Sequence, residues 1–212
     1  MIVAVFTERH GRLTALARGA RSSRKRFGGG LEPMHGLELE FAHGRSERLE
    51  LKAAQVSVPR LHLTSQLERL EAASRALNWV RQASPEGGTE PELWAALVGF
   101  LDALNEPEVP CPRLLLAHTG LQLLAALGWA LDFEHCAACG RTCPPNKSAS
   151  VIASRGGLIC SSCGGGPRRL DALTRGRLAA TGKGQPLTLC PQDAPLALEL
   201  IDEAFAAHAN IG

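Results

Sequence analysis

Four short stretches of the first sixty residues have patterns typical of β-strands: the first is an apolar, β-branched run, and the other three alternate with a period of two. The stretches are residues 2–6, 13–18, 37–41 and 49–52. Glycine-containing turns at residues 10–12 and 43–45 join them in pairs. In the last stretch we expect the leucines to point inward and Glu50 and Lys52 to face water. The pattern predicts a small β-barrel or sandwich.

The period changes to three and four residues after position 61, which indicates amphipathic helices. Apolar positions predict helices over residues 67–80, 92–104 and 113–130. Ser65 with Glu68, and Thr89 with Glu92, have the spacing of capping boxes at the first two helix starts. The third helix is apolar on nearly every side, so we expect it to be central. Trp79, Trp94 and Trp129 fall within these patterns and are interpreted as core residues.

Two Cys-x-x-Cys pairs dominate the chemistry of the C-terminal half. The pairs are Cys136 with Cys139 and Cys160 with Cys163, and each is followed by a glycine that can adopt positive φ. Two such turns can bring four thiolates to one tetrahedral ion, which is the coordination that Zn²⁺ prefers. Four protein ligands leave no position for a catalytic water, so we predict a structural zinc site.

Other interpretations of these cysteines are a pair of disulfides or a redox dithiol. No secretory signal opens the sequence, and a redox Cys-x-x-Cys normally stands alone, so both are less favoured than zinc. Cys143 and His135 are close enough in sequence to compete as metal ligands. Cys111 and Cys190 have the character of ordinary buried thiols.

Beyond the second cysteine pair, apolar spacing predicts helices over residues 171–180 and 194–209, which should pack back onto the third helix. The predicted fold class is therefore α+β. We expect a strand-rich unit at residues 1–60, a helical unit at 61–212, and a zinc ribbon at 133–166 inserted in the helical unit.

Charge is unevenly distributed, although the net charge of the 212 residues is only +2. Seven Lys or Arg and no Asp or Glu lie between residues 9 and 30: Arg9, Arg12, Arg18, Arg21, Arg24, Lys25 and Arg26. Such a segment can follow a phosphate backbone, or it can be a solvated loop. Phe27 is the only aromatic residue among these charges, so base stacking would contribute little.

Several classes of protein are disfavoured by what the sequence lacks. It has no apolar run of about eighteen residues, the length needed to span a membrane, so we expect a cytoplasmic protein. It has no phosphate-binding Walker loop, dinucleotide fingerprint, nucleophile elbow or HExxH motif. We therefore predict that the protein is not an enzyme.

Two stretches together resemble the RecO family of bacterial recombination mediators. They are LTALARGARSSRKRFGGGLEP, residues 13–33, and the cysteine motifs HCAACG and GGLICSSC. The resemblance implies that the N-terminal unit is an oligonucleotide-binding (OB) barrel. In this family a further strand normally precedes the segment that matches residues 2–7. We therefore expect an OB-like barrel that lacks its first strand.

The resemblance also implies a function. It implies binding to single- and double-stranded DNA, annealing of complementary strands, and repair of gaps and double-strand breaks by the RecF pathway. The implied partners are RecR, the C-terminal tail of single-strand-binding protein and, indirectly, RecA, at the nucleoid. The implied DNA contacts are Arg18, Arg21, Arg24, Lys25 and Arg26, and the implied zinc ligands are the four cysteines. A pocket for the tail is expected on the helical unit.

Three hypotheses follow from these observations. The leading one is a DNA-binding recombination mediator that helps load recombinase on single-stranded DNA coated by its binding protein. The second is a zinc-ribbon scaffold that binds proteins and has no direct contact with DNA. The third, a zinc enzyme, would require an open position on the metal.

Overall fold

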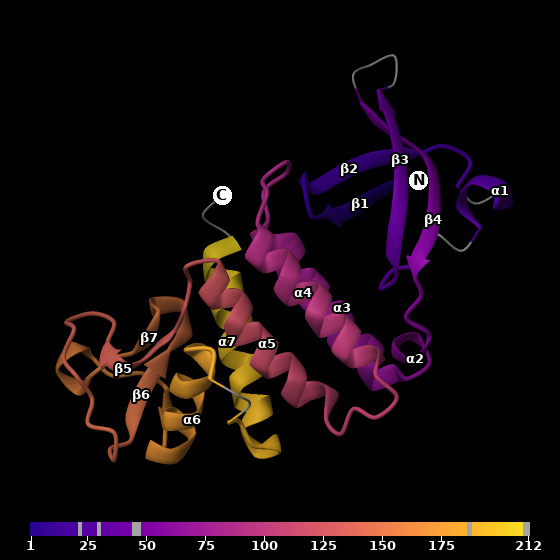
Figure 1. Ribbon diagram of the computed structural model, residues 1–212. Coiled ribbons are helices and arrows are strands. Elements are labelled where there is room, and N and C mark those ends of the chain that lie inside the picture. Colours follow the sequence, from indigo (N-terminus) through magenta and orange to yellow (C-terminus); the bar gives the residue numbers. More distant parts are fainter. Residues whose placement is uncertain (21–22, 29–30, 44–47, 186–187, 210–212) are drawn as a thin grey trace.

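The computed structural model describes residues 1–20, 23–28, 31–43, 48–185 and 188–209. Figure 1 shows three regions in a row: a strand-rich region, a group of long helices, and a small sheet with further helices. The predicted α+β class is confirmed.

The N-terminal region is a four-stranded sheet with the order β1-β2-β4-β3. Its strands are β1 (Ile2–Thr7), β2 (Gly11–Ala17), β3 (Gly36–His43) and β4 (Leu49–Val58). Neighbouring strands are antiparallel except β2 and β4, which are parallel. A short helix, α1 (Arg24–Phe27), follows β2. Within the described residues, β1 and β3 are the two edges of the sheet.

The side chains of this sheet follow the predicted alternation with one exception. Glu38 and Glu40 are exposed, as their positions in β3 require. Glu50 was expected to face water but is buried, and it accepts a hydrogen bond from Lys52 and forms an ion pair with Arg18. Those two cations compensate the burial of its charge, a compensation that strand periodicity cannot reveal.

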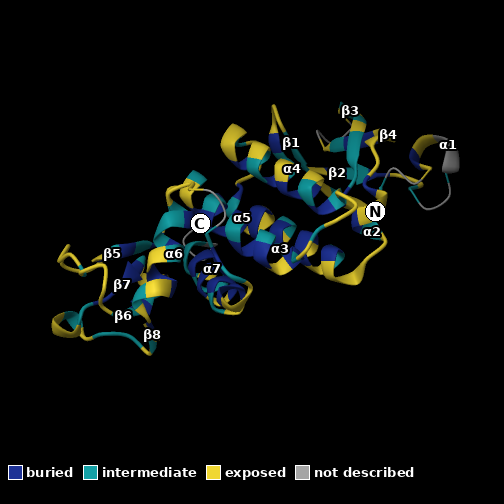
Figure 2. Ribbon diagram, turned by 60° about the horizontal axis from the view of Figure 1, so that its bottom comes forward, coloured by how far each residue is buried: buried dark blue, intermediate teal, exposed yellow. Residues whose placement is uncertain are grey.

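The helical region is built from three long helices and one short turn at its start. They are α2 (Leu61–Thr64), α3 (Leu67–Ala83), α4 (Pro91–Asn105) and α5 (Pro112–Ala126). The interior of α5 is nearly all buried, as Figure 2 shows, and it contacts α3, α4, α6 and α7. Its predicted central position is therefore confirmed.

Three helix ends differ from the sequence prediction. Thr89 does not cap α4, because Glu90 is the N-cap residue there and no side chain caps this helix start. Ser65 does not cap α3, because it closes the preceding turn α2, where its hydroxyl donates to the carbonyl of His62. The end of α5 comes earlier than predicted, because Gly128 adopts a φ of +74° and the amide of Trp129 returns to the carbonyl of Leu124. This is a glycine-terminated helix end. Trp129 therefore lies outside the helix and stacks on His208, with ring centroids 4.6 Å apart.

The small sheet has the order β5-β7-β6-β8. Its elements are β5 (Asp132–Cys136), β6 (Ala149–Ile152), the 3₁₀ turn η1 (Ala153–Arg155), β7 (Gly157–Leu158), the 3₁₀ turn η2 (Ser161–Cys163) and β8 (Arg168–Leu170). We call residues 132–170 the ribbon. The chain then forms α6 (Ala172–Gly182), the turn η3 (Pro191–Asp193) and α7 (Ala194–Ala209).

The ribbon has no separate core, because its apolar residues join the core of the helices. Val151, Leu158 and Leu170 belong to the same buried cluster as α5 and α7. Polar contacts reinforce this attachment: Glu203 on α7 accepts hydrogen bonds from the backbone and hydroxyl of Ser154 and forms an ion pair with Arg168.

Within the described residues, polar contacts between the N-terminal sheet and the helices occur at two places, among others. At the first, the β1–β2 turn meets the α3–α4 loop, where the amide of Gly87 donates to the carbonyl of Arg12. Only glycine fits at position 11, because an added Cβ would lie 1.6 Å from the carbonyl oxygen of Gly88. At the second, the buried Arg60 donates to the carbonyl of Met34 and pairs with Asp102 on α4.

Another buried ion pair fixes the start of α7 to α6. The carboxylate of Asp193 is only 4% exposed and accepts two hydrogen bonds from Arg177, at 2.6 and 2.7 Å, and one from the amide of Cys190. The hydrogen bonds from Arg177 hold the pKa of Asp193 below its ordinary value. This pair should make stability depend on pH.

We predict that Asp193→Asn lowers the free energy of unfolding at pH 7 by about 2 kcal/mol, the usual scale for a hydrogen bond to a charged group. Because the folded pKa is depressed, the stabilisation is present above the unfolded pKa of about 3.9 and is lost as pH falls through the folded value. The difference between the two proteins should therefore shrink below about pH 4. Urea unfolding across pH measures it. The control is Glu71→Gln, which changes an exposed carboxylate on α3. If the difference in free energy of unfolding between wild type and Asp193→Asn grew in acid, the prediction would be contradicted.

Candidate metal centre and basic surface

Four thiols meet at one end of the ribbon. Cys136 ends β5 and Cys139 lies in the turn that follows, whereas Cys160 and Cys163 flank the turn η2. Their four sulfur atoms all lie within 4.8 Å of one another, and the Sγ atoms of Cys139 and Cys160 are 3.8 Å apart. The four residues that the spacing selected are thus brought together.

These distances fit a tetrahedral ion. Thiolates at about 2.3 Å from a central Zn²⁺ would lie about 3.8 Å from each other. A disulfide needs about 2.05 Å between the sulfurs, so Cys139 and Cys160 are not disulfide-bonded, and their separation is consistent with ligands around a shared ion. The donor set of four soft thiolates is also the one that suits zinc and similar metals.

Two glycine turns shape the backbone around the cluster. Gly140 has a φ of +72° and donates its amide to the carbonyl of Cys136, and Gly164 has a φ of +101° after the second pair. The amide of Cys160 donates to the sulfur of Cys136 over 3.3 Å, which links one turn to the other. Backbone amides aimed at sulfur favour the thiolate form.

Hydrogen bonds within the cluster give its thiols different pKa values. The hydrogen bond from the amide of Cys160 lowers the pKa of Cys136 to about 6. The side-chain hydrogen bond with Cys160 raises the pKa of Cys163 to about 12. One sulfur is therefore a thiolate at neutral pH, and another must release its proton when a metal binds.

The two competing ligands lie outside the cluster. The sulfur of Cys143 faces the carbonyl of Pro144 at 3.8 Å, and the ring of His135 pairs with Asp132 through Nδ1. Neither belongs to the group of metal-type ligands among the described residues. Cys111 and Cys190 are half-buried, not buried as expected, and they also do not belong to the cluster.

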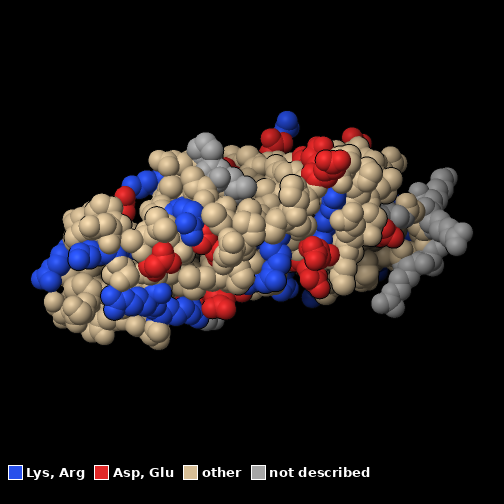
Figure 3. All heavy atoms as spheres, turned by 90° about the horizontal axis from the view of Figure 1, so that it is seen from below, with Lys and Arg blue, Asp and Glu red and all other residues tan. Residues whose placement is uncertain are grey.

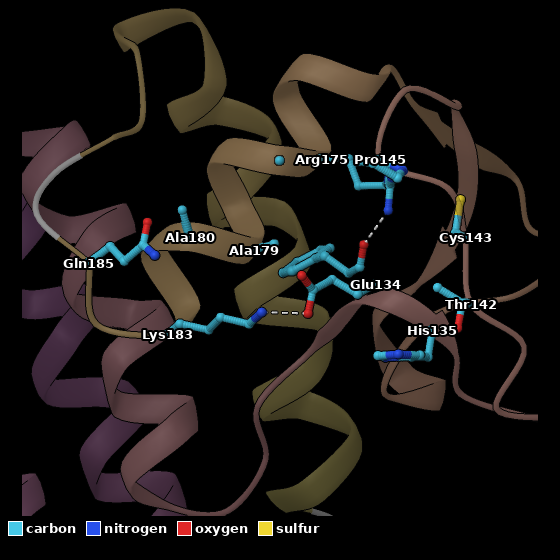
Figure 4. A pocket seen from close by; sticks show the side chains of 12 residues that line it. Glu134, His135, Thr142, Cys143, Pro145, Arg175, Ala179, Ala180, Lys183 and Gln185 are labelled. Carbon is cyan, nitrogen blue, oxygen red and sulfur yellow. Dashed lines mark hydrogen bonds and ion pairs between the residues drawn. The ribbon is translucent and has the colours of Figure 1, made fainter.

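A cavity of about 440 Å³ lies between β5 and α6 (Figure 4). Its floor is mostly apolar, with Phe133, Ala179 and Ala180, while Lys183 and Glu134 form an ion pair at its edge. The buried Arg175 supports the wall by donating to the carbonyls of Phe133 and Pro144. Sequence reasoning gave Arg175 no role, because its partners are main-chain carbonyls far along the chain.

The basic segment after β2 lies at the opposite end of the molecule from the ribbon in both Figure 1 and Figure 2. Phe27 anchors α1, since it is 4% exposed and packs with apolar residues of β2 and β4. A ring buried in this way offers no platform for bases.

The five predicted DNA contacts are described unequally by the structure. Arg18 is exposed and paired with Glu50. Arg26 is exposed and donates to the carbonyl of Arg18 and the hydroxyl of Ser23. Arg24 and Lys25 contribute their backbone to α1, while their side chains, like all of Arg21, lie outside the described residues. The role of these residues stays a prediction.

By fold and site, this is an α+β protein with a tetracysteine ribbon packed on a helical core. Comparison with known proteins gives a particular family. The model "Recombination protein O N terminal" matches residues 1–57 and "Recombination protein O C terminal" matches residues 64–207. The chain belongs to the RecO family.

Individual relatives agree with this assignment. The DNA repair protein RecO of Geobacter metallireducens is 32% identical over 98% of this chain and 84% of its own length. The DNA repair protein RecO of Myxococcus xanthus is 30% identical, again over 98% and 84%. RecO proteins are non-enzymatic recombination mediators, which confirms the prediction that the chain is not an enzyme. Among the described residues, no helix is both long and apolar enough to cross a bilayer.

We predict that Cys139→Ser removes most of the bound divalent metal, whereas Cys143→Ser keeps about one ion per chain. A serine hydroxyl is a poor ligand for a thiophilic ion, and Cys143 is a neighbouring cysteine outside the cluster. Native mass spectrometry gives the stoichiometry, and the thiolate-to-cobalt absorption of a Co²⁺-substituted sample reports the number of thiolates. Equal metal loss in the two variants would count against this ligand set.

Proposed function

We propose that this protein is a DNA-binding recombination mediator of the RecF-pathway type. In this role it anneals complementary strands and helps load a recombinase on single-stranded DNA coated by its binding protein. Residues 1–60 are the OB-like DNA-binding unit, residues 61–212 the helical unit, and residues 133–166 the inserted zinc ribbon. The observation that carries the proposal is the match of both RecO models, in order, along the chain.

Zn²⁺ is the proposed ion, held by Cys136, Cys139, Cys160 and Cys163. The tetrahedral spacing of the sulfurs supports it, and four protein ligands give the ion a structural role. Binding can contribute on the order of 10 kcal/mol or more to the folding of such a site. The ion would secure the outer end of a ribbon whose inner side already rests on the helices.

The proposed DNA contacts are Arg18, Arg21, Arg24, Lys25 and Arg26. Support comes from the charge of the segment, which has no acidic residue between positions 9 and 30, and from its place at one end of the molecule. Arg26 has no carboxylate partner within the described ranges, so its guanidinium keeps donors for a phosphate. The carboxylate of Glu50 pairs with both Arg18 and Lys52, so it does not neutralise Arg18 alone.

We predict that reversing Arg24, Lys25 and Arg26 to Glu weakens binding to single-stranded DNA and makes its salt dependence shallower. Each phosphate contact on a single strand contributes about 0.7 to the slope of log affinity against log salt, so three lost contacts change it by about 2. Fluorescence anisotropy with a labelled oligonucleotide over a salt series measures both quantities.

The control for this experiment is Arg81→Glu combined with Arg113→Glu, two exposed cations on α3 and α5. An unchanged slope and affinity in the triple variant would contradict DNA binding by this segment. A protein that binds no oligonucleotide but still captures protein partners would instead be the zinc-ribbon scaffold.

The proposed partners are DNA, RecR and the acidic, apolar tail of single-strand-binding protein, with RecA reached indirectly. The cavity between β5 and α6 has chemistry that suits the tail. Its apolar floor can take an apolar side chain, and Lys183 at the edge can meet a carboxylate. The ion pair between Lys183 and Glu134 would have to open for this contact.

We predict that Lys183→Glu lowers the affinity for a tail peptide about fivefold, because an exposed ion pair is worth up to about 1 kcal/mol. The affinity for DNA should not change, since α6 lies far from α1 (Figure 1). Isothermal titration with the peptide is the measurement, and Arg81→Glu is the charge-matched control. Unaltered peptide affinity in Lys183→Glu would remove the cavity from consideration.

A further inference from the structure

A second basic region lies at the ribbon end of the molecule. Residues 132–170 contain five Lys or Arg against Asp132 and Glu134, a net charge of +3. Together with residues 9–30, this leaves 11 Lys or Arg against 19 Asp or Glu in the rest of the chain. The chain therefore has two basic segments and an acidic remainder. Figure 3 shows Lys and Arg gathered over the ribbon end of the face in view.

The ribbon also contains a groove of about 390 Å³ next to the cysteine cluster. Two arginines line it, Arg141 and Arg169, together with hydroxyl side chains, and none of its lining residues in the described structure is acidic. The hydroxyl residues are Thr142, Ser148, Ser150 and Ser161. Guanidinium and hydroxyl groups without carboxylates form a surface suited to phosphate oxygens.

Both arginines keep hydrogen-bond donors for a ligand. Arg169 gives two N–H groups to the hydroxyl of Ser148, and Arg141 gives one to the hydroxyl of Ser162, out of five on each guanidinium. Neither has a carboxylate partner in the part of the chain that the structure describes. Arg168, the next residue on β8, contrasts with them, because it pairs with Glu203 and Glu199 on α7.

The strand pairing explains this difference between neighbours. Successive residues of a strand point to opposite faces, so Arg168 faces the helices while Arg169 shares the other face with its cross-strand partner Ser150. Arg169 is exposed, as is Arg141. One arginine thus attaches the ribbon to α7, and the other is presented to solvent in the groove.

The charge of the cysteine cluster does not cancel this basic surface. Cys136 and Cys160 line the groove, and four thiolates around a divalent ion carry a net charge of about −2. Adding this charge to the +3 of residues 132–170 leaves the ribbon with a net charge of about +1. The field at the groove therefore still favours a polyanion.

We infer that the ribbon groove binds backbone phosphates of nucleic acid, as a second contact region in addition to the segment around α1. The inference rests on the proposed DNA-binding function. Because the two regions lie at opposite ends of the molecule and the remaining chain is acidic, they hold separate strands or separate parts of one strand. A protein that holds two strands at once is suited to bringing complementary strands together.

The test uses Arg141→Glu combined with Arg169→Glu, with Arg81→Glu plus Arg113→Glu as the charge-matched control. In the first measurement, the double ribbon variant should have a slope of log affinity against log salt that is shallower by about 1.4 for single-stranded DNA. This is the contribution of two phosphate contacts. The same change should occur in the background of the α1 triple reversal, since distant sites act independently. The control pair should leave the slope unchanged.

The second measurement is capture of two strands. Protein bound to an immobilised oligonucleotide is offered a labelled oligonucleotide of non-complementary sequence. The wild type should retain the second strand, and the ribbon variant should bind the first strand but lose the second. If the ribbon variant captures the second strand as well as wild type, or if its slope equals that of the control pair, the inference is overturned while DNA binding by the α1 segment stands. If the wild type binds no DNA, the proposed function fails as well.

Metal content of each variant, measured by native mass spectrometry, shows whether the ribbon stays folded. Arg169→Glu alone, whose guanidinium donates only to Ser148, replaces the double variant if the latter loses its metal. A polyglutamate peptide provides the remaining comparison. If the ribbon reversals abolish binding of that peptide but leave two-strand capture intact, the groove recognises acidic protein segments, and the assignment to nucleic acid is wrong.

Discussion

The convergence of four sulfur atoms is the constraint on which the C-terminal half depends. The cysteines come from two turns more than twenty residues apart, and the short strands between them offer few backbone hydrogen bonds. On the side that meets the helices, Val151, Leu158 and Leu170 of the ribbon enter the main core. The outer end of the ribbon has no such core, and an ion shared by the four thiolates would supply there the cohesion that apolar burial supplies on the inner side.

Polar side chains with several partners position the remaining parts. Arg60 joins the N-terminal sheet to α4, Arg175 joins α6 to the ribbon, and Glu203 joins α7 to the ribbon. Each is a charged group at a junction between elements, where a buried or half-buried charge is acceptable because its partners satisfy it. The orientation of the ribbon groove and of the cavity between β5 and α6 follows from these junctions.

The distribution of charge connects the architecture with the proposed activity. The net charge of the whole chain is small, yet 12 of its 23 Lys and Arg lie in residues 9–30 and 132–170, and carboxylates outnumber cations in the rest of the chain. A polyanion is therefore attracted to the ends and repelled from the middle. Such an arrangement gives a small protein without catalytic machinery a physical means of holding nucleic acid in more than one place.

Local rules determined a large part of this description from the sequence alone. The strands, the helices and the four-cysteine set follow from periodicity and spacing, because side-chain direction repeats every two residues in a strand and every 3.6 in a helix. Proline at the start of α4 and aspartate before α7 marked helix ends correctly. The family resemblance came from the same stretches of sequence, and both family models agree with it.

Tertiary structure alone decided the features that depend on distant partners. Glu50 is buried because Arg18 and Lys52 meet it, Ser65 closes α2 and not α3, and α5 stops at Ala126 because Gly128 turns the chain. Arg168 and Arg169 are identical neighbours in sequence, yet only the pairing of β8 with β6 and its packing on α7 give them different roles. Periodicity states which way a side chain points, but what it meets there depends on residues far along the chain.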